Sequence, residues 1–392
     1  MKRTDTPTLS GPLHAGDLIN SLVWPRLLRA AGLALHPGRL GLAAGILVLI
    51  GIIASIPGLW LEAGTGPRVT AGDALGGAGA QIVSGVLALD HVSVAHGLWK
   101  FGVDAPTQVV NGHPWSVVII LIPVLLVWGV GGAAIARSAA SEYSLREKTP
   151  WPTALGFGVS KAASLVGAKL TPLLIVAVVV GLLCVGGWVL LRFPLVQAFG
   201  GLAYVLALGG GLVIVVVCAG YLLGGSMLVP SIACEGTDAI DAMQRVYAYA
   251  MARPARLLVY SLVLVIELVL VAVVLASIAN AITSVSAWAT TLLLPEELAM
   301  VAHAAASGET ISGEERGWSM NAMASSIAFW SRLPGFLVGA YLISFYFSGG
   351  TLLYLMMRLV CDGQDPSELW RPGMPAGVVQ HEPAEASDED EE

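Results

Sequence analysis

One carboxylate stands inside the most apolar stretch of the chain. Glu267 lies within YSLVLVIELVLVAVV, residues 260–274, eleven residues beyond Arg256. That distance is about 16 Å along a helix, which is near the middle of a bilayer. A charge there costs about 2.5–3.5 kcal/mol on insertion scales, so such residues face the protein interior and are functional candidates. No Lys or Arg lies at comparable depth, and we expect the neutral acid to be the resting form.

Three hydroxyl groups are candidate partners for Glu267. Tyr341 and Ser344 lie at similar depth in another apolar stretch, and Tyr221 lies nearer the inner side of a third. The favoured interpretation is a hydrogen bond between helices, worth about 0.6–2 kcal/mol. The alternatives are a proton-linked or substrate-binding carboxylate and a carboxylate exposed to lipid. These four residues form the candidate intramembrane polar site.

Other groups with chemical potential lack the spacing that catalysis or ligand binding needs. The glycine clusters at 129–134 and 208–211 have no adjacent lysine, as a phosphate-binding loop would. They predict close helix packing instead, as does the pair Gly220 and Gly224. Cys234 has no partner histidine at a catalytic spacing, and no serine lies in a nucleophile-elbow pattern. We therefore predict no catalytic residues and no enzyme.

Metal binding is weakly indicated. The candidate cluster is Asp90, His91, His96 and His113. His91 and His96 are about 140° apart around a helix, so they point to different faces. We interpret them as surface histidines and predict no metal and no cofactor. A group of acidic residues is expected to be a solvated face, with a cation or basic partner as the alternative: Glu296, Glu297, Glu309, Glu314 and Glu315.

These residues belong to a chain with the composition of a membrane protein. Of its 392 residues, 56% are hydrophobic and 12% are charged, against about 25% charged in soluble domains. Runs of about 20 apolar residues can each cross the hydrocarbon as a helix. The sequence predicts an all-α fold with six spans, at Leu40–Leu61, Trp115–Ala136, Leu170–Leu191, Tyr204–Leu228, Leu257–Ile278 and Leu333–Met357.

The basic residues predict the orientation of these spans. Most of the 20 Lys and Arg residues fall in segments that share one side when the amino terminus is inside, and such segments stay cytoplasmic. We therefore expect both termini in the cytoplasm of a bacterial inner membrane, with outer loops at 62–114 and 279–332. The rival arrangement has a seventh span at 79–102. The first 39 residues lack a signal-peptide pattern, so the first span is expected to be uncleaved.

Amphipathic helices are predicted beside the spans. Residues 236–258 and 149–172 each carry apolar positions at helical spacing, followed by a proline near the next span. The cytoplasmic segment 1–39, before the six-helix domain at 40–358, carries a third amphipathic stretch. Thr237 or Asp238 is expected to cap the first of these helices, and Pro254 to end it. Five arginines are expected to bind lipid headgroups: Arg26, Arg29, Arg245, Arg253 and Arg256. The tail at 359–392 ends in an acidic run that is expected to be disordered.

Three segments carry a resemblance to a known group of proteins. They are ALHPGRLGLAAGILVLIGI, EGTDAIDAMQRVYAYAMARP and LYLMMRLVCDGQDPSELW. They resemble corresponding segments of an uncharacterised family of bacterial polytopic membrane proteins. The middle one more distantly resembles the membrane domain that accompanies some glycerophosphodiester phosphodiesterases. The resemblance implies a helical membrane fold and no activity, because the chain has no phosphodiesterase domain.

Two functions remain open from the sequence. The first is a non-enzymatic scaffold or accessory subunit, whose partners are the lipid bilayer and a membrane protein or a second copy. The second is a small transporter or channel with Glu267 at its midplane. Scarce polar residues in the spans favour the first. The net charge of −7 would repel a nucleic acid, so we expect no nucleic-acid partner.

Overall fold

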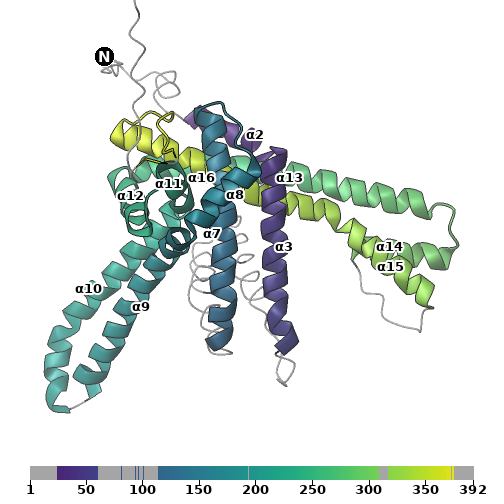
Figure 1. The fold of residues 1–392 in the computed structure, drawn as a ribbon. Helices are drawn as coiled ribbons and strands as arrows, with labels where there is room; N and C mark the ends of the chain where they lie inside the picture. The colour runs from purple at the N-terminus through teal and green to yellow at the C-terminus, as the bar shows by residue number, and fades with distance from the viewer. Residues whose placement is uncertain are drawn as a thin grey trace, which may run out of the picture. The chain divides into compact units, whose positions relative to one another are not determined.

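The computed structural model describes residues 24–60, 114–192, 194–308, 317–371 and 373–374, together with positions 81, 93, 96 and 100. Regular structure in these residues is helical, without a strand, so the predicted all-α class is confirmed (Figure 1). Most of the rival seventh span at 79–102, most of the outer loop 62–114 and the acidic end of the tail lie outside the described residues.

The described helices succeed one another along the chain. They are η1 (Trp24–Arg29), α2 (Ala30–Ala34), α3 (Pro37–Trp60), α7 (Pro114–Ser144), α8 (Trp151–Ser160), α9 (Ala162–Arg192), α10 (Pro194–Gly224), α11 (Leu228–Glu235), α12 (Ala239–Ala252), α13 (Pro254–Thr291), α14 (Glu296–Ser307), α15 (Trp318–Ser331) and α16 (Leu333–Asp362). Val48–Trp128 form one compact unit, which includes the end of α3 and the start of α7. The rest of the chain forms the other unit, in which all the contacts below occur.

The described helices are those of a multi-pass membrane protein. Five stretches are long and apolar enough to cross a bilayer, and they correspond to the second to sixth predicted spans. The first predicted span lies in α3, which passes the same test when joined to Trp24–Ala34, with a 72° bend between them. The helices extend well past several predicted ends, as α13 does to Thr291. Hydropathy marks the apolar part of a helix, whereas hydrogen bonding and capping set its ends.

The amino-terminal amphipathic stretch forms the short helical segment Trp24–Ala34, which packs against α13 and α16. Leu27, Ala30 and Ala34 are fully buried in a core that includes Tyr260 and Phe345. The amphipathic pattern therefore matches a face that is buried against other helices. Its opposite face, with Arg26 and Arg29, is exposed.

Local sequence signals set the boundaries of α12. Asp238 caps its start, because its carboxylate accepts the N–H groups of Ile240 and Asp241. Pro254 begins α13 directly after Arg253, the carboxyl cap of α12. Both boundaries were predicted. The comparable segment 149–172 differs, because α8 ends at Ser160 and Pro172 lies inside α9 rather than at its start. The two amphipathic segments therefore differ at the proline.

Glycines allow the helices to approach closely, as predicted. A Cβ atom on Gly132 would lie 2.2 Å from the Phe347 ring. Gly220 and Gly224 likewise admit Tyr247 and Val246, at 2.4 Å from their ideal Cβ positions. Real Cβ contacts are not that short, so a larger residue at any of these positions requires the neighbour to move.

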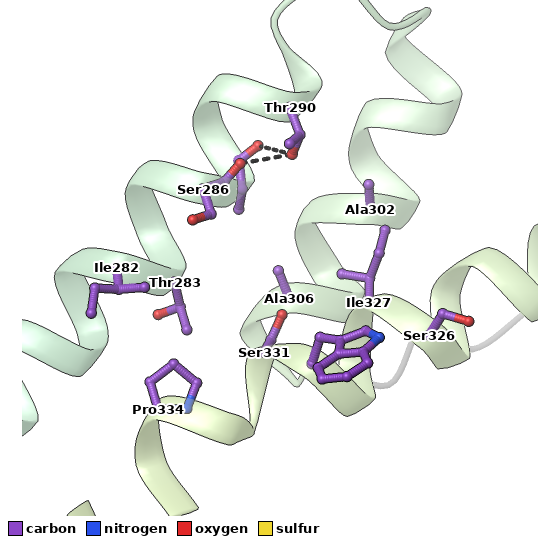
Figure 2. Close-up of a pocket in the computed structure, with 12 residues that line it drawn as sticks. Ile282, Thr283, Ser286, Thr290, Ala302, Ala306, Ser326, Ile327, Ser331 and Pro334 are labelled. Carbon is purple, nitrogen blue, oxygen red and sulfur yellow. Dashed lines mark hydrogen bonds between the residues drawn. The ribbon is translucent and has the colours of Figure 1, made fainter. Parts of the chain in front are cut away.

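A cavity of about 330 Å³ lies among α13, α14, α15 and the first turn of α16. Figure 2 shows side chains of α13 on one side of it and those of α14 and α15 on the other. The lining combines small, hydroxyl and apolar residues: Ile282, Thr283, Ser286, Ala287, Thr290, Ala302, Ala306, Ser326, Ile327, Trp330, Ser331 and Pro334.

Candidate functional site

Glu267 lies on α13 and binds the amino-terminal segment. Its Oε1 atom accepts the backbone N–H of Ala31 at 3.1 Å. The residue is 8% exposed, and its other oxygen has no hydrogen-bond partner among the described residues. The buried carboxyl thus satisfies a backbone donor that is 236 positions away in the sequence.

Tyr341 and Ser344 of α16 bind the same segment. The Ser344 hydroxyl donates to the Ala34 carbonyl at 2.8 Å, and the Tyr341 hydroxyl donates to the Ala31 carbonyl over a long 3.4 Å. A short helix leaves backbone groups unpaired at its ends, and buried backbone groups require partners. Three of the four residues in the predicted polar site therefore converge, and they do so on the backbone of α2.

Tyr221, the fourth residue, belongs to a different cluster. Its ring lies 5.5 Å from the Lys169 ammonium group, and Lys169 donates to the Gly225 carbonyl at 2.7 Å. Lys169 is 6% exposed. It therefore satisfies a carbonyl near the end of α10 and contacts a nearby aromatic face. No hydrogen bond or ion pair joins this cluster to Glu267 in the described part of the chain.

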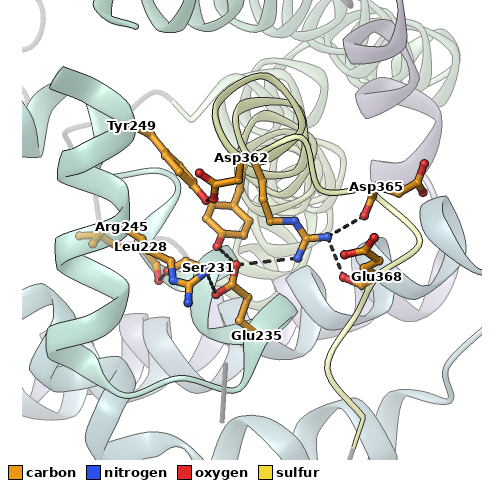
Figure 3. Close-up of polar contacts among 10 residues, drawn as sticks. Leu228, Ser231, Glu235, Arg245, Tyr249, Asp362, Asp365 and Glu368 are labelled. Carbon is orange, nitrogen blue, oxygen red and sulfur yellow. Dashed lines mark hydrogen bonds and ion pairs between the residues drawn. The ribbon is translucent and has the colours of Figure 1, made fainter. Parts of the chain in front are cut away.

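A second buried polar cluster surrounds Glu235, the last residue of α11 (Figure 3). Its carboxylate accepts the Tyr354 hydroxyl and lies 2.8 Å from Arg245. Arg358 lies 3.8 Å from it and donates to the carbonyls of Asp365 and Glu368, at 3.0 and 2.7 Å. This cluster ties α11, α12 and α16 to the chain that follows α16.

The carboxyl end of α11 is held by donors from three distant segments. All eight residues of this helix are buried, so water cannot satisfy its last carbonyls. Arg137 donates to Ala233 O at 2.9 Å, and Lys161 donates to Gly236 O at 2.5 Å. The Trp370 N–H donates to Cys234 O at 2.9 Å. Two of the donors are cations, which also suit the negative end of the helix dipole.

Gly236 ends α11 and cannot be replaced without cost. Its φ is +64°, a left-handed conformation in which glycine avoids the steric penalty of a side chain. A Cβ atom there would also lie 2.6 Å from the Trp370 indole. The Arg137 guanidinium lies 5.8 Å from the same ring, so the indole lies close to both the glycine and a cation.

Electrostatics around this cluster match a structural role. Burial raises the pKa of the Cys234 thiol to about 12, so it stays protonated and a poor nucleophile at neutral pH. Burial lowers the pKa of Arg245, but the Glu235 carboxylate together with Tyr354 and Tyr249 outweighs that effect, and the net shift is upward. The Ser367 hydroxyl and N–H lower the pKa of Asp365, which favours its charged form in the turn after α16.

The five arginines predicted to bind headgroups have different surroundings. Arg26, Arg29, Arg253 and Arg256 are exposed. The Arg245 side chain is 34% exposed and forms an ion pair with Glu235. Its long side chain thus bonds inward to the protein.

Sequence reasoning did not identify the ion pairs of Glu235, Arg358, Arg39 and Glu142. Arg39 and Arg358 are fully buried, although both were counted as loop charges for the orientation. Arg39 forms an ion pair with Glu142, which is 103 positions away in the sequence. The small residues beside Glu142 in IARSAASE could have indicated that this helix end is buried against another segment, because small side chains permit close packing.

The predicted metal candidates do not assemble in the described part of the chain. His96 is exposed, whereas Asp90, His91 and His113 lie outside the described residues. Among the described residues, no group of three or more His, Cys, Asp or Glu is placed to hold a metal ion. Glu296 and Glu297 begin α14 and are exposed. Glu309, Glu314 and Glu315 lie outside the described residues.

Comparisons with known proteins identify no relative. No family model matches the chain, and no curated protein or solved structure matches it.

Proposed function

We propose that this membrane protein is a non-enzymatic scaffold or accessory subunit. It belongs to the bacterial inner membrane in this proposal, with both termini in the cytoplasm. Its partners are the lipid bilayer and a membrane protein or a second copy of the chain. The resemblance to bacterial polytopic membrane proteins fits this location, and it supplies no activity.

One observation carries the proposal: the buried charged side chains hold the fold together. Among the described residues these are Arg39, Lys169, Glu235, Glu267 and Arg358. Each bonds to a backbone group or to a side chain of opposite charge or a hydroxyl. No charged side chain lines the cavity among α13, α14 and α15, or a second cavity of about 410 Å³ that Ile175, Tyr247 and Met251 help to line. Polar groups of a transport path or a catalytic site converge on open space instead.

The long apolar helices offer the surfaces that a scaffold needs. Helices α9 and α10 pack against each other along a hairpin, and their outward side chains are exposed, including Leu182, Leu206 and Leu222. Such faces meet lipid tails or another membrane helix. The exposed apolar faces of α9 and α10 are therefore available for association with another membrane protein or a second copy within the bilayer.

The second candidate function is a transporter or channel with Glu267 at its midplane. The observation in its favour is the Glu267 oxygen that has no partner among the described residues. A carboxyl with one free oxygen can exchange a proton. Its other oxygen already binds Ala31, however, which gives the group a complete structural role.

Cross-linking in intact membranes, followed by mild extraction and native mass spectrometry, tests the scaffold function. We expect the wild-type chain at a fixed stoichiometry with a partner or a second copy. The Glu267→Gln variant should keep that stoichiometry, because the amide oxygen still accepts the Ala31 N–H. A monomer without a partner in both samples would contradict the proposal. Loss of pH-dependent solute uptake in a folded Glu267→Gln variant would favour the transporter.

A further inference from the structure

Three exposed arginines surround the turn at the end of α16. Arg26 lies on η1, Arg253 is the carboxyl cap of α12, and Arg256 lies in the first turn of α13. Arg253 and Arg256 are close enough to the Cys361 thiol to act on it electrostatically, and Arg26 acts in the same way on Asp365. Two segments that are far apart in the sequence therefore place positive charges around one turn.

Packing of the amino-terminal segment fixes this arrangement. Helix η1 packs against both α13 and α16. Leu27, which follows Arg26, and Leu257, which follows Arg256, are both fully buried in the same hydrophobic core. A buried neighbour therefore holds the backbone beside each of these arginines, whereas the arginines themselves are exposed. The guanidinium groups can meet on one ligand without a change in the backbone.

The positive charge of this surface is only partly compensated. None of the three arginines forms an ion pair with a described residue. Two exposed aspartates lie at the same turn (Figure 3). Asp362 accepts the Tyr249 hydroxyl, and Asp365 accepts the hydroxyl and N–H groups of Ser367. Each aspartate thus already has a donor, and the arginines keep an excess of positive charge for an external anion.

Exposed leucines beside the arginines indicate which anion fits. Leu28 lies between Arg26 and Arg29 and is 49% exposed, and Leu258 lies two residues after Arg256 and is 54% exposed. A soluble anion or an acidic peptide would leave these leucines uncovered. A phospholipid covers both kinds of group, because its phosphate meets the guanidinium groups and its acyl chains meet the leucines.

We propose that Arg26, Arg253 and Arg256 bind the phosphate of an anionic phospholipid in the cytoplasmic leaflet. Guanidinium groups form paired charge-assisted hydrogen bonds with phosphate oxygens. Because the arginines come from η1 and from the start of α13, one bound headgroup joins these two elements. The lipid thereby helps to hold the amino-terminal segment that Glu267 and Ser344 also bind.

This site rests on the membrane location and orientation of the proposed function, and it adds a specific lipid ligand to them. The scaffold function is tested by the stoichiometry of a partner, whereas the site is tested by the response of the amino-terminal segment to lipid. Either one can therefore fail without the other.

Hydrogen exchange in nanodiscs of defined lipid tests the site. The full chain is placed in phosphatidylcholine nanodiscs with increasing shares of phosphatidylglycerol, and exchange is measured on peptides covering residues 24–35. We expect phosphatidylglycerol to slow this exchange, because its phosphate is not paired with a cation of its own as in phosphatidylcholine. Inorganic phosphate, added to phosphatidylcholine nanodiscs at constant ionic strength, should not slow it. Equal exchange in both lipids, or protection by inorganic phosphate, would overturn the proposal.

Matched variants separate a defined site from general charge. Arg26→Gln, Arg253→Gln and Arg256→Gln should each raise the phosphatidylglycerol share needed for half-maximal protection about fivefold, the change that a loss of about 1 kcal/mol in binding produces. Arg146→Gln is the control, because Arg146 is also exposed but lies after α7, and it should leave that share unchanged. Wild-type exchange in the α9–α10 hairpin shows that each variant is folded. No shift in the first three variants, or the same shift in all four, would refute the site.

The acidic run at residues 382–392 is the rival occupant of these arginines. Deleting it should leave the exchange of residues 24–35 in phosphatidylcholine nanodiscs unchanged, because the site binds lipid rather than the tail. Faster exchange after the deletion would assign the arginines to the tail and overturn the proposal.

Discussion

Ser344 and Ser348 lie one turn apart on α16, and both are fully buried. The Ser344 hydroxyl donates to the Ala34 carbonyl. The Ser348 hydroxyl has no hydrogen-bond partner among the described residues. The two serines therefore have the same helix and burial but different roles. They form a natural pair for measuring what one bond to the amino-terminal segment contributes.

Ser344→Ala should lower the free energy of unfolding by about 1–3 kcal/mol, because the buried Ala34 carbonyl loses its donor. Ser348→Ala should leave that free energy unchanged or raise it slightly, since it removes an unsatisfied buried hydroxyl. Reversible unfolding in detergent micelles measures both. Equal losses for the two variants would contradict a specific role for the bond to Ala34.

The importance of Glu267, Tyr341 and Ser344 could be predicted from the sequence because each is polar at a depth where neighbours are apolar. Their shared partner could not. They bind the backbone of α2, and any residue type supplies the same N–H and C=O groups. The grouping of Tyr221 with them failed for a related reason: depth along a span does not say which neighbouring helix a side chain faces.

At the scale of the element, α11 depends on contacts from outside itself. It is a short, wholly buried helix, and an isolated helix of this length is not stable in water. Its carboxyl end is completed by Arg137, Lys161 and Trp370, from α7, the junction of α8 with α9, and the chain after α16. Gly236 provides both the left-handed turn and the space for the indole.

Gly236→Ala should destabilise the fold more than Gly363→Ala. Both glycines are left-handed caps, with φ of +64° and +71°. A Cβ atom on Gly363 meets open space, whereas one on Gly236 meets Trp370. The Gly363 variant should lose about 1–2 kcal/mol of the free energy of unfolding, from the backbone strain alone. The Gly236 variant should lose about 1–3 kcal/mol more, through overpacking.

Denaturant titration of both glycine variants gives the comparison. Because the backbone strain is common to them, the difference reports the packing of Trp370 against Gly236. Identical losses would mean that the indole shifts freely, which would contradict its role in holding the end of α11.

Helix α12 shows which element boundaries the sequence could predict. Asp238 and Pro254 act on their own helix ends, so local chemistry was sufficient for both boundaries. The buried pairs Arg39 with Glu142 and Arg358 with Glu235 join residues over 100 positions apart. Hydrophobic periodicity and charge counts describe one segment at a time. They therefore could not show that Arg39 and Arg358 are buried in ion pairs, and both were treated as loop residues.

At the scale of the whole molecule, the amino-terminal segment Trp24–Ala34 links two long helices, α13 and α16. Glu267 of α13 and Ser344 of α16 both bind it, and its apolar face lies in the core between them. Composition and hydropathy were sufficient to predict a helical membrane protein. They were not sufficient to predict that a segment before the first span would become part of the core.

The central claim is that Glu267 fixes this segment in place rather than binding a transported solute. Hydrogen exchange of the Ala31 amide, measured on peptides covering residues 24–35 in nanodiscs, tests it most directly. Glu267→Gln should keep the wild-type protection, because its amide oxygen still accepts the bond. Glu267→Leu, which has a similar volume and no acceptor, should exchange about tenfold faster, as expected for losing about 1.4 kcal/mol of local stability. Unchanged protection in Glu267→Leu would contradict the claim.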